Sequence, residues 1–247
     1  MISRRHLLAG GAGLILTGCD RLNDSSAFRE TLRSAEGLTM KAQRLITDRN
    51  ALAREFSAAD LSPVFRSNGN RMPQGDNYRR LAGGRFADWR LRIDGLVQRP
   101  LALSLDRIMT LPRRTQITRH DCVEGWSAIG QWTGVPLSIL LDAAGLRDQA
   151  RFLVFHCMDR FGAWPYYESI ELVDAFHPQT ILAYGLNGQL LPIANGAPLR
   201  LRVERQLGYK QAKYLARIEA VASLAGIHRG RGGYWEDSSD YEWYAGI

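Results

Sequence analysis

Residues 117–136 read ITRHDCVEGWSAIGQWTGVP and contain Cys122, one of three cysteines in the chain. Glu124, Gly125 and Trp126 follow closely, so the thiol is expected to lie in a bend rich in glycine and tryptophan. A thiolate is a soft ligand, and such a bend can present it to a soft metal ion. An ordinary buried cysteine is the alternative, and this stretch alone leaves both interpretations open.

The overall composition is that of a soluble globular protein. Of the 247 residues, 45% are hydrophobic and 23% are charged, both ordinary fractions, and the length allows one large domain or two small ones. The formal net charge is +7, but the basic residues are scattered and form no dense run. Nucleic-acid binding favours a concentrated basic stripe, so we expect no such partner. We expect the excess positive charge to favour a cleft that binds an anionic ligand.

The first residues resemble an export signal. Residues 3–8 read SRRHLL, and the apolar, glycine-rich run AGGAGLILTG follows. Two adjacent arginines before such a run are typical of twin-arginine export, a route for proteins that fold before they are exported, often around a cofactor. The run is too short to span a bilayer, which needs about 20 apolar residues.

The signal ends in a second motif. Residues 16–19 read LTGC, which resembles a bacterial lipobox, so Cys19 is the expected lipid anchor and residues 1–19 form the signal. Asp20 resembles the residue that retains lipoproteins on the inner membrane. We therefore expect a periplasmic protein of a Gram-negative bacterium, tethered by lipid; a chance cysteine in a removed signal is the alternative. Cys122 and Cys157 then remain, and in an exported protein such a pair also suggests a disulfide bond.

The rest of the chain is divided into a spacer and one domain. Residues 20–60 are polar, with apolar residues at helical intervals, and predict a partly helical spacer. Residues 61–247 form the predicted domain, whose first part, 61–88, is rich in Gly, Asn, Pro and Arg and reads as a long irregular loop.

Short strands dominate the predicted domain. Alternating apolar residues predict strands at 89–97 and 198–204, a strongly apolar run predicts one at 151–160, and further strands are expected at 115–119 and 212–223. Helices are expected at 104–111 and 136–145, with the residues from Trp132 to Pro136 leading into the second. Asn187-Gly188 predicts a hairpin turn within 181–191. The fold class is therefore α+β and β-rich.

Five motifs then occur in a fixed order: DCVEGW at 121–126, WTGVPL at 132–137, NGQLLP at 187–192, NGAPLRL at 195–201 and GYKQAKYL at 208–215. Together, behind a twin-arginine signal, they resemble the molybdenum-cofactor domain of the sulfite oxidase family. The resemblance is greatest to the bacterial branch near the catalytic subunit of the periplasmic methionine sulfoxide reductase. It covers roughly residues 60–247 and implies a sulfite-oxidase-type fold with a molybdenum-molybdopterin cofactor.

The resemblance also implies roles for particular residues. Cys122 matches the thiolate ligand of molybdenum, so a disulfide bond with Cys157 is not expected. Glu124 is the candidate catalytic carboxylate, which relays a proton or is held structurally by the turn. Arg119 and His120 flank the cysteine, and because side chains alternate along a strand, at most one of them faces the substrate. The residues expected to bind the cofactor, several of them around its phosphate, are Asn68, Arg71, Met72, Cys157, Asn195, Arg200, Lys210, Gln211, Ala212 and Lys213.

These features predict a molybdopterin-dependent oxidoreductase that transfers an oxygen atom on a small S- or N-oxo substrate. The chain contains no C-x-x-C-H haem motif, so electrons are expected to pass to or from a separate cytochrome or membrane haem protein. The segment CVEGW lacks the arginine cluster that follows the cysteine in sulfite oxidases, which argues against simple sulfite oxidation. The alternatives are a cofactor-free periplasmic binding lipoprotein with the same fold, and a plain disulfide-bonded periplasmic domain.

Overall fold

The computed structural model describes residues 25–48 and 50–247, and it divides the chain into two units, Met1–Asp48 and Arg49–Ile247. The predicted export signal and Cys19, the predicted lipid anchor, lie outside the described residues.

The described part of the first unit is mainly one helix, α2 (Ser26–Ile46). Its start is capped by Ser25, whose side chain accepts a hydrogen bond from the amide of Phe28 and so satisfies one of the free donors of the first turn. This helix lies within the stretch that the sequence predicts as a partly helical spacer. Among the described residues, no helix is both long enough and apolar enough to cross a membrane.

The second unit begins before residue 61, the predicted start of the domain, because the preceding residues are hydrogen bonded to it. The amide of Phe56 donates to the carbonyl of Ile117 at 2.8 Å. The amide of Ala53 donates to the side-chain oxygen of Gln179 at 2.7 Å. These bonds attach the end of the predicted spacer to the domain.

The first sheet contains five strands in the spatial order β2 (Leu101–Ser104), β1 (Arg90–Gly95), β10 (Leu215–Val221), β5 (Phe152–Phe161) and β6 (Trp164–Glu171). Strands β1 and β10 are parallel, and the other neighbours are antiparallel. Burial alternates along β1, where Leu91 and Ile93 are fully buried, as the sequence predicts. Strand β6 was not predicted, and it forms a hairpin with β5.

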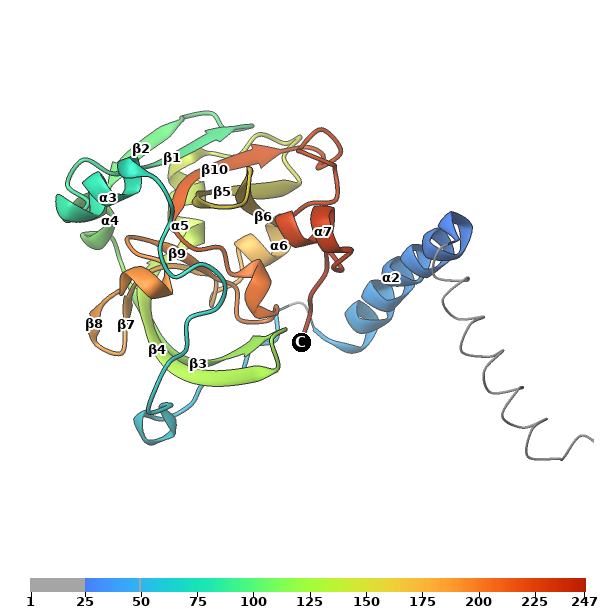
Figure 1. The fold of residues 1–247 in the computed structure, drawn as a ribbon, viewed down its shortest axis with the longest axis horizontal. Helices are drawn as coiled ribbons and strands as arrows, with labels where there is room; N and C mark the ends of the chain where they lie inside the picture. The colour runs from blue at the N-terminus through green and yellow to red at the C-terminus, as the bar shows by residue number, and fades with distance from the viewer. Residues whose placement is uncertain (1–24, 49) are drawn as a thin grey trace, which may run out of the picture. The chain divides into compact units, whose positions relative to one another are not determined.

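The second sheet is antiparallel, and its members are β3 (Arg114–Cys122), β4 (Trp126–Pro136), β7 (Ile181–Leu186), β8 (Gln189–Leu190) and β9 (Arg200–Arg202). The β3–β4 hairpin runs along one side of the unit (Figure 1). Trp132 and its neighbours lead into the predicted helix as a strand and are not part of its first turn. They lie in β4, whose residues alternate in burial, and the helix begins only at Leu137. The Asn187-Gly188 turn between β7 and β8 is confirmed.

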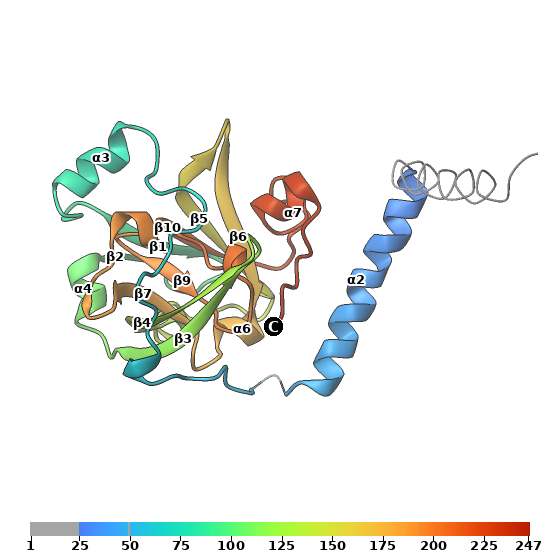
Figure 2. The ribbon, with the colours of Figure 1, turned by 60° about the horizontal axis from the view of Figure 1, so that its bottom comes forward.

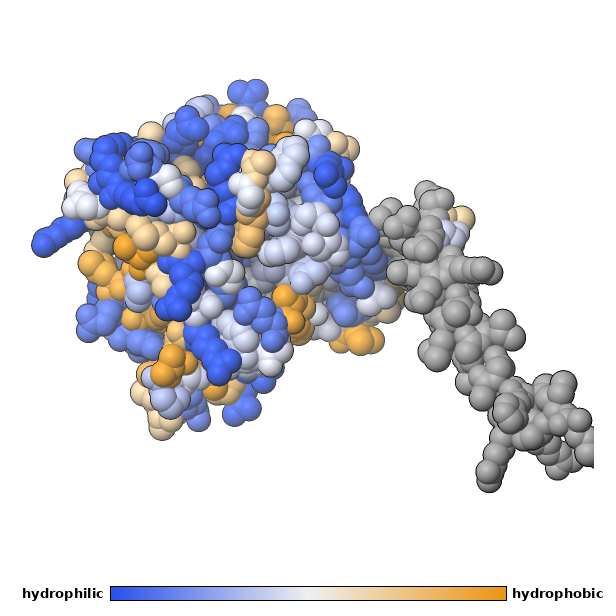
Figure 3. Space-filling model, in the orientation of Figure 1, coloured by the Kyte–Doolittle hydropathy of each residue, from blue (hydrophilic) through white to orange (hydrophobic). Residues whose placement is uncertain are grey.

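One main hydrophobic core joins the two sheets. It contains side chains of β1, β5 and β10 together with Val135 of β4, Leu182 of β7 and Leu201 of β9. Helix α5 (Leu137–Ala144) packs Leu137, Leu140 and other apolar side chains into this core. The surface in Figure 3 is mainly hydrophilic, with hydrophobic side chains in small groups. The β-rich α+β class predicted from the sequence is confirmed.

The remaining helical segments are short. A helix within residues 61–88 corrects the prediction of an irregular loop, because Tyr78 and Leu81 are buried by its inner face. Another lies near the C-terminus, next to β6 (Figure 2). These segments are η1 (Ala58–Asp60), α3 (Asp76–Gly83), α4 (Leu105–Met109), α6 (Leu172–Ala175), η2 (Ile193–Asn195), η3 (Gly208–Lys210) and α7 (Tyr234–Ser239).

Candidate active site

A cavity of about 220 Å³ lies beside the turn that joins β3 to β4. Five of the predicted site residues are on its wall: Asn68, Cys122, Glu124, Gln211 and Lys213. The other lining residues come from the loop before α3, from the β5–β6 hairpin, from η3 and from α7 and its flank. They are Gly69, Asn70, Val123, Asp159, Phe161, Tyr166, Gly208, Tyr209, Trp235 and Tyr241.

Cys122 is the last residue of β3 and is 9% exposed. The tight turn that follows depends on Gly125, which has a φ of +81° and donates its amide to the Cys122 carbonyl at 3.0 Å. Burial raises the pKa of the Cys122 thiol, so the thiolate is costly unless a cation stands beside it. A bound metal ion is the usual way to stabilise such a thiolate.

The face of β3 that carries Cys122 is mainly polar. Gln116, Thr118 and His120 are buried on this face, whereas Arg119 is exposed and bonds to Asp121 at 3.0 Å. Only one of the pair Arg119 and His120 therefore points inward.

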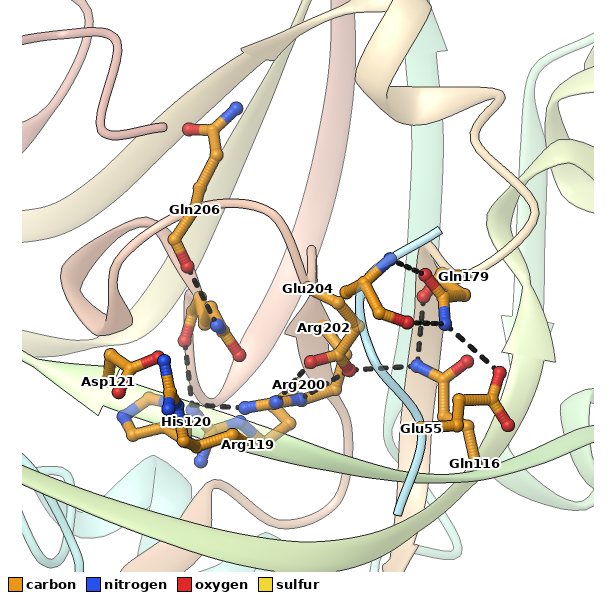
Figure 4. A network of polar contacts seen from close by, with 12 residues as sticks. Glu55, Gln116, Arg119, His120, Asp121, Gln179, Arg200, Arg202, Glu204 and Gln206 are labelled. Carbon is orange, nitrogen blue, oxygen red and sulfur yellow. Dashed lines mark hydrogen bonds and ion pairs between the residues drawn. The ribbon is translucent and has the colours of Figure 1, made fainter. Parts of the chain in front are cut away.

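A buried polar network holds this face in place (Figure 4). His120 Nδ1 is 2.9 Å from the Arg202 guanidinium, and Arg202 forms an ion pair with Glu204 at 2.5 Å. Gln116 donates to Glu204 at 2.8 Å and to the Gln179 carbonyl at 3.0 Å. Burial, together with Arg202, holds the pKa of His120 well below its usual value, so this histidine is neutral. The network fixes the strand that ends at Cys122.

Glu124 is held by the turn. It is exposed, and its carboxylate accepts a hydrogen bond of 2.9 Å from the indole of Trp126. This contact favours the structural role among the two that the sequence left open, although the residue does line the cavity.

Lys213 joins the loop before α3 to the rest of the site. Its ammonium donates to the carbonyl of Asn68 at 2.6 Å, to that of Ala194 at 3.0 Å and to that of Asn70. Burial, and next the charge of Arg200, lowers the pKa of Lys213 to about 7. The lysine thus positions Asn68 on the wall of the cavity.

Arg200 and Asn195 are buried behind the wall and do not line the cavity. Arg200 donates to the Asn195 carbonyl at 2.9 Å, and its guanidinium lies 4.9 Å from the ring centre of Trp132. Burial, and next the charge of Arg202, lowers the pKa of Arg200 to about 9. Within the described part of the chain, Arg200 Nε, Asn195 Nδ2 and Gln211 Oε1 have no hydrogen-bond partner.

Lys210 does not face the cavity, contrary to its predicted contact with the cofactor phosphate. It is fully buried, and its ammonium forms ion pairs with Glu168 at 2.8 Å and with Glu236 of α7 at 2.5 Å. Both partners are distant in sequence, so motif spacing did not reveal them. The triad binds α7 to β6 and η3, and thereby places Trp235 on the cavity wall.

Four other predicted residues are also outside the cavity wall. Met72 is 44% exposed, and neither it nor Arg71 lines the cavity. Cys157 packs against the main core and Ala212 is buried within it. Cys122 and Cys157 are both free thiols.

Sequence reasoning missed Asp159 and the aromatic residues of the wall. Asp159 lies in the part of β5 where the pairing with β6 is irregular, so strand alternation gave no signal for its position. Trp235 and Tyr241 belong to the C-terminal segment, for which no structure was predicted. His120 also explains why position 208 is a glycine, because a Cβ there would lie 2.5 Å from His120 Nε2.

The residues of the site fit a molybdenum-pterin group. A buried thiol suits a soft, high-valent metal. The unpaired buried atoms of Asn195, Arg200 and Gln211 suit a polar, phosphate-bearing ligand, because buried polar groups are rarely left without partners. Among the described residues, no group of three or more His, Cys, Asp and Glu side chains is placed to hold a metal ion.

Comparisons with known proteins agree with this fit. Residues 81–225 match the family described as the oxidoreductase molybdopterin binding domain. The chain therefore belongs to this family of molybdenum-cofactor oxidoreductases, the sulfite oxidase family. The predicted family, enzyme class and cofactor are thereby confirmed.

Three similar proteins illustrate the family. The chain is 36% identical over 243 residues to YedZ1 of Azospira oryzae, provisionally assigned as a protein-methionine-sulfoxide reductase subunit, covering 98% of this chain and 86% of that one. It is 37% identical over 144 residues to the protein-methionine-sulfoxide reductase catalytic subunit MsrP of Ralstonia nicotianae, covering 54% of this chain and 44% of MsrP. The structure of the sulfane dehydrogenase SoxCD from Paracoccus pantotrophus matches with a TM-score of 0.51 and 25% identity, over 56% of this chain and 39% of SoxCD.

Proposed function

We propose that this chain is an exported catalytic subunit that removes the oxygen atom from small S- or N-oxides and receives electrons from a separate haem protein. The observation that carries the proposal is the buried thiol of Cys122 on the wall of a cavity that also contains Asn68, Gln211 and Lys213. The bound cofactor supplies the two-electron oxygen-atom chemistry. The chain supplies binding, orientation and proton control.

Each group of residues has a proposed task. Cys122 provides the thiolate for molybdenum. Gln211 and Lys213 lie on the cavity wall, and Asn195 and Arg200, buried behind it, each keep an unpaired donor that the phosphate of the cofactor would satisfy. Charge-assisted bonds from a guanidinium suit a phosphate in both strength and geometry.

The substrate is proposed to be a sulfoxide carried on an apolar group. Phe161, Trp235 and Tyr241 form an aromatic part of the wall, and sulfur makes favourable contacts with aromatic rings. Two relatives carry names of protein-methionine-sulfoxide reductase subunits, which supports the S-oxide class. The missing arginine cluster after Cys122 disfavours sulfite.

Location and electron supply are also proposed. The twin-arginine motif and the LTGC motif at residues 16–19 support export to the periplasm and lipid attachment to the inner membrane through Cys19. The word subunit in the names of both relatives supports a separate redox partner, for which a cytochrome or membrane haem protein suits single-electron delivery.

The test is to isolate the exported protein from a host supplied with molybdate, and to measure molybdenum, pterin and dye-driven reduction of S-oxides, N-oxides and sulfite. Folded, exported protein without molybdenum and pterin would refute the proposal. Cys122→Ser should lower turnover by more than about 100-fold, beyond the usual effect of an outer partner of a metal ligand, with little change in the unfolding midpoint.

Cys157→Ser is the matched control, because Cys157 is the other free thiol among the described residues and lies outside the cavity wall. This variant should retain molybdenum and most of the turnover. Near-normal turnover by Cys122→Ser would show that the thiol is not the ligand.

A further inference from the structure

Two carboxyl groups lie on the wall of the cavity, and their surroundings differ. Glu124 is exposed and paired with the Trp126 indole. Asp159 of β5 is only 3% exposed; its Oδ2 accepts a hydrogen bond of 3.1 Å from Asn70, and its Oδ1 has no partner among the described residues. A buried carboxyl oxygen without a donor is stabilised when the group carries a proton.

We propose that Asp159 is a catalytic acid of this cavity and gives a proton to the oxygen atom that leaves the substrate. This inference rests on the proposed reductase function. For a sulfoxide, the balanced change is R₂SO + 2 H⁺ + 2 e⁻ → R₂S + H₂O. The S–O bond breaks, two O–H bonds form and sulfur is reduced by two electrons from the haem protein. Asp159 supplies one proton and regains it from solvent, and the second proton comes from solvent.

The electrostatics agree with this role. Burial raises the pKa of Asp159 to about 6, and the hydrogen bond from Asn70 and the charge of Lys213 limit the rise. An acid is most effective when its pKa lies near the working pH. The titratable groups that share the cavity wall or interact electrostatically with Asp159 are Lys213, Cys122, Glu124, Cys157, Tyr78, Tyr166, Tyr209, Tyr214 and Tyr241.

The other groups with protons are less suitable. The Lys213 ammonium is occupied by three backbone carbonyls. Burial raises the pKa of Tyr166 well above its usual value, and its hydroxyl donates to the Tyr209 carbonyl at 2.7 Å. Glu124 is exposed, and its carboxylate already accepts a hydrogen bond from the Trp126 indole. Asp159 alone among them combines burial with a carboxyl oxygen that has no partner.

The first experiment compares Asp159→Asn with Glu124→Gln in the cofactor-loaded enzyme, using a dye as the electron donor. Wild-type kcat should fall as pH rises through about 6, because the protonated form is the active one. Asp159→Asn should lower kcat by about 10²- to 10⁴-fold, the usual contribution of a general acid, and should lose this pH dependence. Glu124→Gln should keep the pH dependence, and Asp159→Glu should restore part of the rate.

A second readout does not depend on activity. The infrared band of a protonated carboxyl group should titrate near pH 6 in the wild type, be missing in Asp159→Asn and persist in Glu124→Gln. Molybdenum and pterin contents should be equal in the three proteins. The asparagine side chain can still accept the hydrogen bond from Asn70, so the local structure should be kept.

The outcomes separate the two proposals. If the wild type is active and Asp159→Asn has the same rate and the same pH profile, the role of Asp159 is overturned and the proposed function is not. A flat pH profile in Glu124→Gln, or a carboxyl band that still titrates near pH 6 in Asp159→Asn, would have the same consequence. A wild type that holds the cofactor and reduces none of the oxides would refute the proposed function, and the proton-transfer role with it.

Discussion

Removing the charge of Lys210 should strongly destabilise the second unit. The ammonium lies 2.8 Å from Glu168 and 2.5 Å from Glu236, and the three side chains are at most 1% exposed. Lys210→Met keeps the length of the side chain but leaves two buried carboxyl groups without a cation. Breaking a buried ion pair from one side costs about 3–5 kcal/mol. At about 2–4 °C per kcal/mol for a unit of this size, the melting temperature should fall by about 6–20 °C.

The assay is urea and thermal unfolding followed by tryptophan fluorescence. The matched control is Lys41→Met, because Lys41 lies on an exposed face of α2 and its loss should change the free energy of unfolding by no more than about 0.5 kcal/mol. A Lys210→Met variant within about 1 kcal/mol of the wild type would refute the reasoning that the triad holds buried charge.

Glu168→Gln tests the same triad from the other side. Burial, and next the charge of Glu236, raises the pKa of Glu168 well above its usual value, so folding takes up a proton above about pH 4.3, the value in an unfolded chain. Stability therefore falls as pH rises between the unfolded and folded pKa values. Glutamine imitates the protonated form, so the variant should match the wild type at low pH and be relatively more stable at neutral pH. A loss as large as that of Lys210→Met would show that Glu168 is ionised.

Two further substitutions test the wall of the cavity. Gly208→Ala would place a Cβ 2.5 Å from His120 Nε2; this overpacking should cost about 1–3 kcal/mol and lower the pterin content, whereas Gly226→Ala, with open space around it, should do neither. Lys213→Met leaves three backbone carbonyls without their donor; it should destabilise the protein by about 1–3 kcal/mol and speed amide exchange around residues 67–70, and unchanged exchange there would contradict the positioning role.

The sequence predicted the strands and turns whose structure depends mainly on their own residues. Apolar patterning of the sequence located β1, β5 and β10, and Asn187-Gly188 located a hairpin turn. The same signal failed for β4, because its buried positions include Gly130 and Gly134, which carry no apolar side chain. The helix α3 was missed because only Tyr78 and Leu81 face inward.

The site divides in a similar way. Motif order identified Cys122, Gln211 and Lys213, because each lies in a turn or segment whose shape is set by its own neighbours. It failed for Lys210, whose partners Glu168 and Glu236 come from distant segments. Asp159 was missed for the same reason, since its burial depends on how the loop before α3 packs over β5.

Two segments of the cavity wall have a consequence for biosynthesis. One contains Asn68 and Asn70, whose carbonyls accept hydrogen bonds from Lys213, and the other contains Trp235. Both segments lie outside residues 81–225, one on each side. During translation the cavity cannot be complete until residues near Tyr241 have left the ribosome. The wall of the cavity is therefore complete only after both ends of the domain have been synthesised and have folded against residues 81–225.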